Sequence, residues 1–105
     1  MQRTFDFYSD PGHGWLKVPR ALIKTLGIEH EISNYSYKRR EYAYLEEDSD
    51  AGLFLTKYLQ LTGKSARLNR HWTNKQSRIR NYQDYCPEST FIKDHFIVCT
   101  IGAIR

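Results

Sequence analysis

One segment of the chain has the pattern of an amphipathic helix that must cover another layer of structure. In EEDSDAGLFLTKYLQLTG, residues 46–63, Asp48 or Ser49 can cap the first turn and Gly63 can end the helix. Acidic residues crowd the first turn, where the helix dipole favours them. The apolar stripe consists of Ala51, Phe54, Leu55, Tyr58 and Leu59. The segment therefore predicts a helix that covers one face of a sheet.

Three shorter segments alternate as strands do. Residues 3–9, RTFDFYS, place Phe5 and Phe7 on one face and more polar residues on the other, which suits a half-buried strand. Residues 32–37 and 42–47 are rich in tyrosine and are separated by the polar sequence KRRE. We expect these two segments to form a β-hairpin that is stabilised by tyrosine pairs across its strands.

The stretch SDPGHGWLKVPR, residues 9–20, has the composition of a catalytic loop, but turn chemistry explains most of it. Its DPG, residues 10–12, is a strong turn signal, because proline sets one backbone torsion and glycine tolerates a positive one. The stretch lacks the third glycine of a dinucleotide fingerprint and the Gly-Lys-Ser/Thr of a phosphate loop. We expect a structural turn anchored in the core by Trp15, then a short helix from Pro19 to Gly27.

The second half of the chain has weaker patterns. Residues 66–72 and 77–82 each alternate, which predicts a second, basic hairpin with Arg78 and Arg80 on one face. Pro87 interrupts this pattern. The apolar sequence that follows predicts a final buried strand, or a tail that must pair to avoid aggregation.

These patterns together predict a single α+β domain, with an antiparallel sheet of about four to five strands packed on two helices. At 105 residues the chain is long enough for one hydrophobic core and too short for two. Residues 1–86 form the main body of this domain. Residues 87–105 form a C-terminal strand or tail whose place in the fold the sequence leaves open.

Composition and cysteine content are typical of a globular cytoplasmic protein. Apolar residues make up 40% of the chain and charged residues 27%, a balance that folded domains share. Cys86 and Cys99 form neither a Cys-x-x-Cys site nor a dense disulfide framework, so we predict a reducing compartment, and whether they pair stays open. The first residues lack the pattern of a secretory signal, and no apolar run reaches the ~18 residues of a membrane span. We therefore expect no membrane partner.

Positive charge is concentrated in the second half of the chain. Residues 1–50 carry seven Lys or Arg against nine Asp or Glu, whereas residues 51–105 carry nine against three. Aromatic residues interleave with this charge, which favours an anionic partner, because guanidinium groups grip phosphates and rings stack on bases. The predicted partner-binding residues are Arg67, Arg70, His71, Trp72, Lys75, Arg78, Arg80 and Tyr82, joined by Lys38, Arg39 and Arg40 from the first hairpin turn. Trp72 belongs alternatively to the core.

An acidic cluster at a strand-to-helix junction offers an alternative site. Four of its carboxylates lie within five residues, and a divalent cation held there would activate water. The candidate set is Asp10, His13, Glu46, Glu47, Asp48 and Asp50. Helices also recruit acids at their first turn for capping alone, so the cluster has a structural explanation as well. No zinc-ligand spacing among the histidines and no nucleophile motif is present, and we predict no cofactor.

Three stretches of the chain resemble small uncharacterised proteins carried by bacteriophages and plasmids. They are SDPGHGWLKVPRALIKTLGI, ISNYSYKRREYAYLEEDSDAGLFL and SRIRNYQDY, with the glycine-rich turn and YLEEDSDA as the longest shared elements. The resemblance spans roughly residues 5–85 and implies no assigned activity, so no catalytic residue carries over. By association it implies a host-takeover or anti-defence role in a bacterial host, such as inhibition of a CRISPR or restriction complex.

Three functions remain open at this point. We favour a non-enzymatic binding protein of a phage or mobile element, which uses a basic and aromatic surface against nucleic acid or a nucleic-acid-binding host complex. The alternative is a small metal-dependent nuclease or hydrolase at the acidic junction with Asp10 and His13. The third is a structural or regulatory interaction protein that does not contact nucleic acid. The sequence does not set the oligomeric state.

Overall fold

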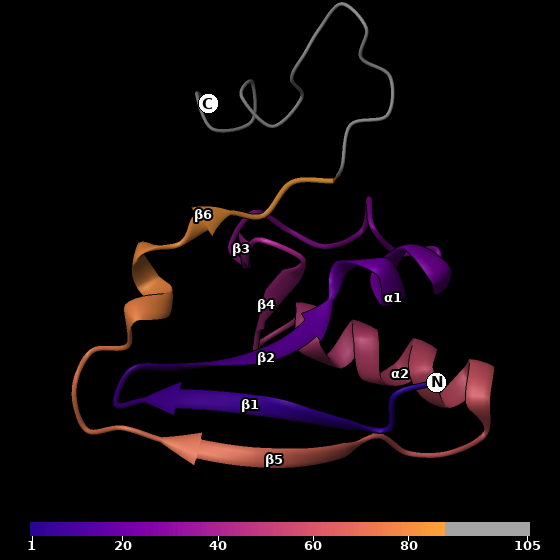
Figure 1. Cartoon of the computed structure of the whole chain (residues 1–105), viewed down its shortest axis with the longest axis horizontal. Helices are drawn as coiled ribbons and strands as arrows, with labels where there is room; N and C mark the ends of the chain where they lie inside the picture. Colours follow the sequence, from indigo (N-terminus) through magenta and orange to yellow (C-terminus); the bar gives the residue numbers. More distant parts are fainter. Residues whose placement is uncertain (88–105) are drawn as a thin grey trace, which may run out of the picture.

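The strands of this chain form one sheet, as Figure 1 shows. A computed structural model describes residues 1–87, and within them the sheet has six strands in the order β5-β1-β2-β4-β3-β6, with two helices. The α+β class is confirmed, although the sheet has more strands than the predicted four to five. It is also mixed, because β1 and β5 run parallel. The strand predicted after Pro87 lies outside the described residues.

The structural turn that we expected at residues 10–12 is present as the turn of a tight hairpin, and Trp15 is buried as predicted. Strand β1 (Thr4–Asp10) pairs antiparallel with β2 (His13–Pro19), which leaves a two-residue turn between them. An oxygen of the Asp10 side chain accepts the N–H groups of residues 12 and 13 at 3.0 Å, so the turn signal was sound. Beyond the turn the chain continues as β2, whose side chains alternate between the two faces of the sheet.

A second hairpin forms close to where the tyrosine-rich segments predicted it. Strand β3 (Tyr37–Arg39) pairs with β4 (Tyr42–Glu46), and Arg40 in the turn between them has a φ of 58°. Residues 32–36 precede the strand as turns, so β3 is shorter than expected. The predicted short helix after Pro19 is confirmed as α1 (Arg20–Thr25).

The predicted long helix is present as α2 (Asp50–Thr62). Gly63 ends it with a φ of +74°, and its N–H donates to the carbonyl of Leu59 at 2.8 Å. The cap differs from the prediction, because a carboxylate oxygen of Glu46 accepts the first N–H groups, at 2.6 Å from Ser49 and 3.0 Å from Asp50. This capping carboxylate comes from the preceding strand instead of from the helix start.

The basic hairpin predicted in residues 66–82 is wrong. Strand β5 (Arg67–Trp72) pairs in parallel with β1, whose sequence lies more than sixty residues earlier. The segment expected to be its partner forms a 3-10 helix, η1 (Arg78–Asn81), and strand β6 (Gln83–Asp84), which pairs with β3. Parallel strands need a long crossover, and α2 together with the second hairpin supplies it.

The sheet has two faces of different chemistry. The helix face carries the main core, formed by Phe5, Leu16, Val18, Ala43 and Leu45 of the sheet with Leu22 and Ile23 of α1 and Ala51, Phe54 and Tyr58 of α2. The open face carries Trp15, Tyr44 and Ile79, flanked by Tyr8, Tyr37, Tyr42 and Tyr82. Both helices cover one face, and among residues 1–87 the segment around η1 covers part of the other. Neither helix of residues 1–87 is long and apolar enough to cross a membrane.

Candidate functional site

The open face contains a hollow lined by tyrosines and cations, which we call the aromatic hollow. Its volume is about 620 Å³. Its lining consists of Tyr8, Lys17, Arg39, Tyr44, Thr73, Lys75, Gln76, Ser77, Arg78, Ile79 and Tyr82. Four of these residues are cationic and none is acidic, so the hollow has the chemistry to bind an anion with aromatic parts.

The floor of the aromatic hollow is formed by side chains that alternate along β1, β2 and β4. Tyr8 follows Phe7 on β1, so its ring points to the face opposite the core phenylalanine. Lys17 lies between two core residues of β2 for the same reason, and it is paired in register with Tyr44 of β4. The sequence analysis missed these three residues as a site. The alternation of RTFDFYS and WLKVP was the signal that could have found them.

The rings of the aromatic hollow are held by contacts with one another and with cations. Tyr44 and Tyr82 meet edge to face with centroids 5.0 Å apart, and the Arg39 guanidinium lies 5.1 Å from the Tyr82 centroid. The His71 ring stacks on Tyr8 at 4.7 Å. Burial raises the pKa of Tyr44 to about 12 and also raises that of Tyr8. Both hydroxyls therefore keep their protons at neutral pH and can donate hydrogen bonds.

A buried carboxylate holds the segment that forms one wall of the hollow. Asp10, whose side chain is 1% exposed, accepts from Nε of Arg80 at 2.8 Å, from its Nη2 at 2.9 Å and from the N–H of Ser77 at 2.8 Å. These donors hold the pKa of Asp10 far below its usual range, with the Arg80 hydrogen bond as the largest cause. Asp10 therefore joins the β1–β2 turn to η1. Its role here is structural.

Four of the predicted partner-binding residues line the aromatic hollow. They are Arg39, Lys75, Arg78 and Tyr82. His71 lies beside them, stacked on Tyr8, and its Nε2 is 3.0 Å from Asp6. The His71 hydrogen bond lowers the pKa of the Asp6 carboxyl. The predicted stretch around residues 71–82 thus contributes one side of the hollow.

The other predicted residues lie elsewhere. Arg80 is engaged by Asp10 and covers Trp15, with its guanidinium 5.2 Å from the ring. On β5, Arg70 contacts the Phe7 ring at 5.3 Å, so it points to the helix side of the sheet, and alternation places Trp72 on that side too. Trp72 is 67% exposed, so the alternative that placed it in the core is corrected.

Three further predicted cations also lie away from the aromatic hollow. Arg67 is exposed at the start of β5, and Arg40 is exposed in the β3–β4 turn, where its carbonyl accepts from Arg20. Lys38 is buried, with Nζ 3.1 Å from Sγ of Cys86. We predicted it as a surface cation, but its neighbour in the strand, Arg39, is the one that faces the open side.

The structure brings together half of the alternative metal-binding set. One ligand atom each of His13, Glu46 and Asp48 lie within 4.8 Å of one another. Asp10 is engaged by Arg80, and Asp50 accepts hydrogen bonds from Ser33 and Ser36 in the core. Glu47 is exposed and is not one of the three converging residues. Three of the six predicted residues therefore lie together, and the other three lie outside this cluster.

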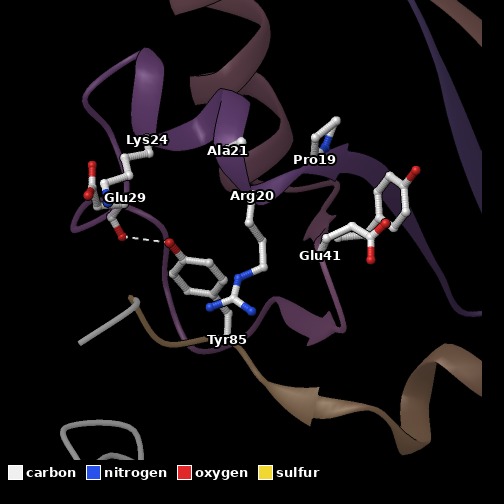
Figure 2. Close-up of a pocket in the computed structure, with 8 residues that line it drawn as sticks. Pro19, Arg20, Ala21, Lys24, Glu29, Glu41 and Tyr85 are labelled. Atoms are coloured by element: carbon white, nitrogen blue, oxygen red, sulfur yellow. Dashed lines mark hydrogen bonds between the residues drawn. The ribbon is translucent and has the colours of Figure 1, made fainter. Parts of the chain in front are cut away.

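A second hollow lies between α1, the β3–β4 turn and Tyr85, as Figure 2 shows. Its volume is about 430 Å³, and the Tyr85 hydroxyl donates to the carbonyl of Glu29 at its edge, 2.8 Å away. Arg20 and Lys24 are balanced there by the carboxylates of Glu29 and Glu41. Because its charges cancel, this hollow is a weaker candidate for an anionic ligand than the aromatic hollow.

Comparisons with known proteins leave the site to be judged on its own geometry. The aromatic hollow joins residues of β1, β2, β3 and β4 with the segment 73–82. The resemblance to bacteriophage and plasmid proteins stays a prediction. No family model, no curated protein and no solved structure matches this chain.

Proposed function

We propose that this chain is a non-enzymatic binding protein and that the open face of its sheet binds single-stranded nucleic acid. The observation that carries the proposal is the lining of the aromatic hollow, in which three tyrosines lie among four cations without an acidic residue. Proteins that bind single strands combine a cationic groove for the phosphates with aromatic side chains on which bases stack. The hollow offers both on one face.

The positions of the side chains suggest which of them contact phosphates and which contact bases. Lys75 and Arg78 are exposed on the segment that borders the hollow, where they can reach phosphates. Tyr82 and Tyr8 are half-buried and offer ring surface to a base. Lys17 lies 4.3 Å from the Tyr42 centroid, so its charge is held against the floor of this face.

The place of action, the origin and the biological role are further parts of the proposal. A cytoplasmic site of action, a phage or plasmid origin and an anti-defence role follow from the sequence and its resemblance alone. A host nucleoprotein complex is the partner that such a role would require, and Arg and Tyr are the residues that dominate protein interfaces. An acidic protein surface would use the same hollow, so the experiment below separates it from nucleic acid.

The test is a fluorescence-anisotropy titration with labelled 12-nucleotide single-stranded DNA and RNA over a series of salt concentrations. Four phosphate contacts predict that log K falls with log salt with a slope of about −3. Tyr82→Ala should weaken binding by about 5- to 150-fold, since stacking on one ring contributes about 1–3 kcal/mol. Tyr35→Ala is the matched control, because Tyr35 is 78% exposed and does not line the aromatic hollow.

Two results would contradict the proposal. One is the absence of binding to both nucleic acids at 50 mM salt, which would favour a protein partner. The other is an equal loss of affinity in Tyr82→Ala and Tyr35→Ala, because binding would then not depend on the tyrosines that line the aromatic hollow. Far-UV circular dichroism of each variant shows whether the fold is intact.

A further inference from the structure

Away from the aromatic hollow, three metal-ligand side chains meet next to the β1–β2 turn. They are the imidazole of His13 and the carboxylates of Glu46 and Asp48, with one ligand atom of each within 4.8 Å of the others. The pairing of β2 with β4 brings them together, because Trp15 lies opposite Glu46 in register. Residues distant in sequence thus converge through the sheet.

The Glu46 carboxylate is held in place by the helix that it caps. Its Oε1 accepts the N–H groups of Ser49 and Asp50, at 2.6 and 3.0 Å. Because both bonds go to Oε1, the other oxygen stays available for a ligand. The side chain is also 94% buried by its neighbours, so its orientation is constrained before any ligand arrives. A preorientated carboxylate loses little side-chain entropy on binding a cation.

A second observation at the same place points to a ligand-binding site. Trp15 lines the same hollow, of about 460 Å³, together with His13, Glu46 and Asp48. Its side chain is 1% exposed, and its Nε1 is the one buried side-chain polar atom within residues 1–87 that has no hydrogen-bond partner. Buried donors in folded proteins nearly always have an acceptor. An oxygen brought in by a ligand would supply one.

We propose that His13, Glu46 and Asp48 bind a divalent transition-metal cation of the zinc type. One imidazole nitrogen and two carboxylate oxygens leave coordination positions for water, and such a water can accept the hydrogen bond of Trp15 Nε1. The imidazole favours zinc and nickel over magnesium and calcium, which prefer oxygen ligands alone.

The neighbouring charges are compatible with a cation. Arg80 also lines this hollow, and an unpaired guanidinium would repel a metal ion. Its Nε lies 2.8 Å from the Asp10 carboxylate, so the positive charge is paired. Asp10, which the sequence analysis included among the ligands, thus neutralises Arg80 instead of binding the metal. The proposed site is independent of the nucleic-acid surface.

Trp15 offers a local readout for the test. The chain has two tryptophans, so Trp72→Phe leaves Trp15 as the only indole fluorophore. The Trp15 and His13 rings are 5.4 Å apart, close enough for a bound Ni²⁺ ion to quench the fluorescence. In this background we expect saturable quenching by Ni²⁺ at micromolar concentration, competition by Zn²⁺, and no competition by equal concentrations of Mg²⁺ or Ca²⁺.

Substitutions test whether the metal ion binds to His13 and Asp48. His13→Ala and Asp48→Asn should each weaken Ni²⁺ binding at least tenfold, and both change side chains that do not cap α2. His30→Ala is the matched control and should leave the affinity unchanged, because His30 is exposed and outside the cluster. Absence of saturable quenching below millimolar Ni²⁺, or unchanged quenching in His13→Ala, would overturn the proposal. Nucleic-acid binding should survive both substitutions, which separates this result from the test of the proposed function.

Discussion

The two faces of the sheet are formed by the same strands, but one carries the main core and the other carries the aromatic hollow. On the helix face, Phe5, Leu16 and Leu45 lie under two helices and are 0–1% exposed. On the open face, Tyr8, Lys17 and Tyr82 stay half-buried around a hollow. Strands β1, β2 and β4 supply residues to both faces by alternation, so the difference between the faces lies in what covers them.

This contrast shows how a small domain can use different residues for stability and for binding a ligand. Aliphatic and phenylalanine side chains gain most from complete burial, and they are on the covered face. Tyrosine, lysine and arginine have apolar bodies with polar ends, so they can be partly buried and still offer groups to a ligand. We expect substitutions of buried residues to affect mainly stability, and substitutions of the exposed or half-buried residues of the aromatic hollow, such as Lys75, Arg78 and Tyr82, to affect mainly binding.

The largest effect is expected from Phe54→Ala on the helix face. The Phe54 ring is fully buried and packs edge to face on Phe5 at 5.2 Å and near Tyr58 at 6.0 Å. Its loss leaves a cavity and should lower the free energy of unfolding by about 3–5 kcal/mol. Urea denaturation followed by circular dichroism measures this change. A loss below 1 kcal/mol would break the comparison, because the covered face would then not carry the stability.

The next largest loss of stability is expected at Asp10, whose hydrogen bonds to Ser77 and Arg80 attach the segment around η1 to the sheet. Asp10→Asn removes the charge that accepts from Arg80 and should cost about 3 kcal/mol at pH 7. Folding lowers the pKa of Asp10, so its contribution is present above the unfolded pKa of about 3.9 and is lost as pH falls through the folded value. The gap between wild type and Asp10→Asn should therefore narrow below about pH 4. A gap independent of pH would exclude the charge as its cause.

A smaller effect is expected from Tyr44 at alkaline pH. Burial raises its pKa to about 12, so the folded state favours the neutral phenol. That contribution is complete below the unfolded pKa of about 10 and is lost as the pH rises towards 12. Chemical denaturation at pH 8, 10 and 11.5 should show wild type losing stability relative to Tyr44→Phe across this window. Parallel curves for the two proteins would mean that Tyr44 is solvated.

The smallest effect is expected from His71 on the open face. It pairs with Asp6 at 3.0 Å, but the two side chains are 43% and 37% exposed. Water screens such pairs, so His71→Ala should lower the free energy of unfolding by less than about 1 kcal/mol. The same denaturation assay measures it. A loss as large as that of Phe54→Ala would remove the distinction between the faces.

The sequence predicted the local elements well, because their signals lie within a few residues. In α2, Ala51, Phe54 and Tyr58 of the predicted stripe are buried and Gly63 ends the helix, because a helix forms from contacts three and four residues apart. Leu59 of that stripe is 47% exposed, which corrects its place in the core. The turn at residues 10–12 was predicted, but the strand that follows it, β2, was not. Gly14 instead lies within β2, where a Cβ would be 2.6 Å from Phe7, so it reflects close packing.

Long-range pairing could not be predicted in the same way. The parallel contact of β1 with β5 and the bond of Asp10 to Arg80 join residues more than sixty positions apart. Nothing local distinguishes Arg80, which is engaged by Asp10, from Arg78, which lines the aromatic hollow. The charge of the stretch was predictable, but which cations face the ligand depends on this tertiary pairing.

The most direct test of the central claim compares the loss of two cations on each side of the sheet. Lys75→Gln/Arg78→Gln removes two charges of the aromatic hollow, and Lys24→Gln/Lys64→Gln removes two exposed charges in α1 and after α2. Affinity for single-stranded DNA and RNA is measured over a salt series. We predict that the first variant loses at least tenfold and that its salt slope becomes shallower by about 1.4, while the second changes less than about twofold. Equal losses in the two variants would contradict the account, because binding would then follow net charge and not the open face.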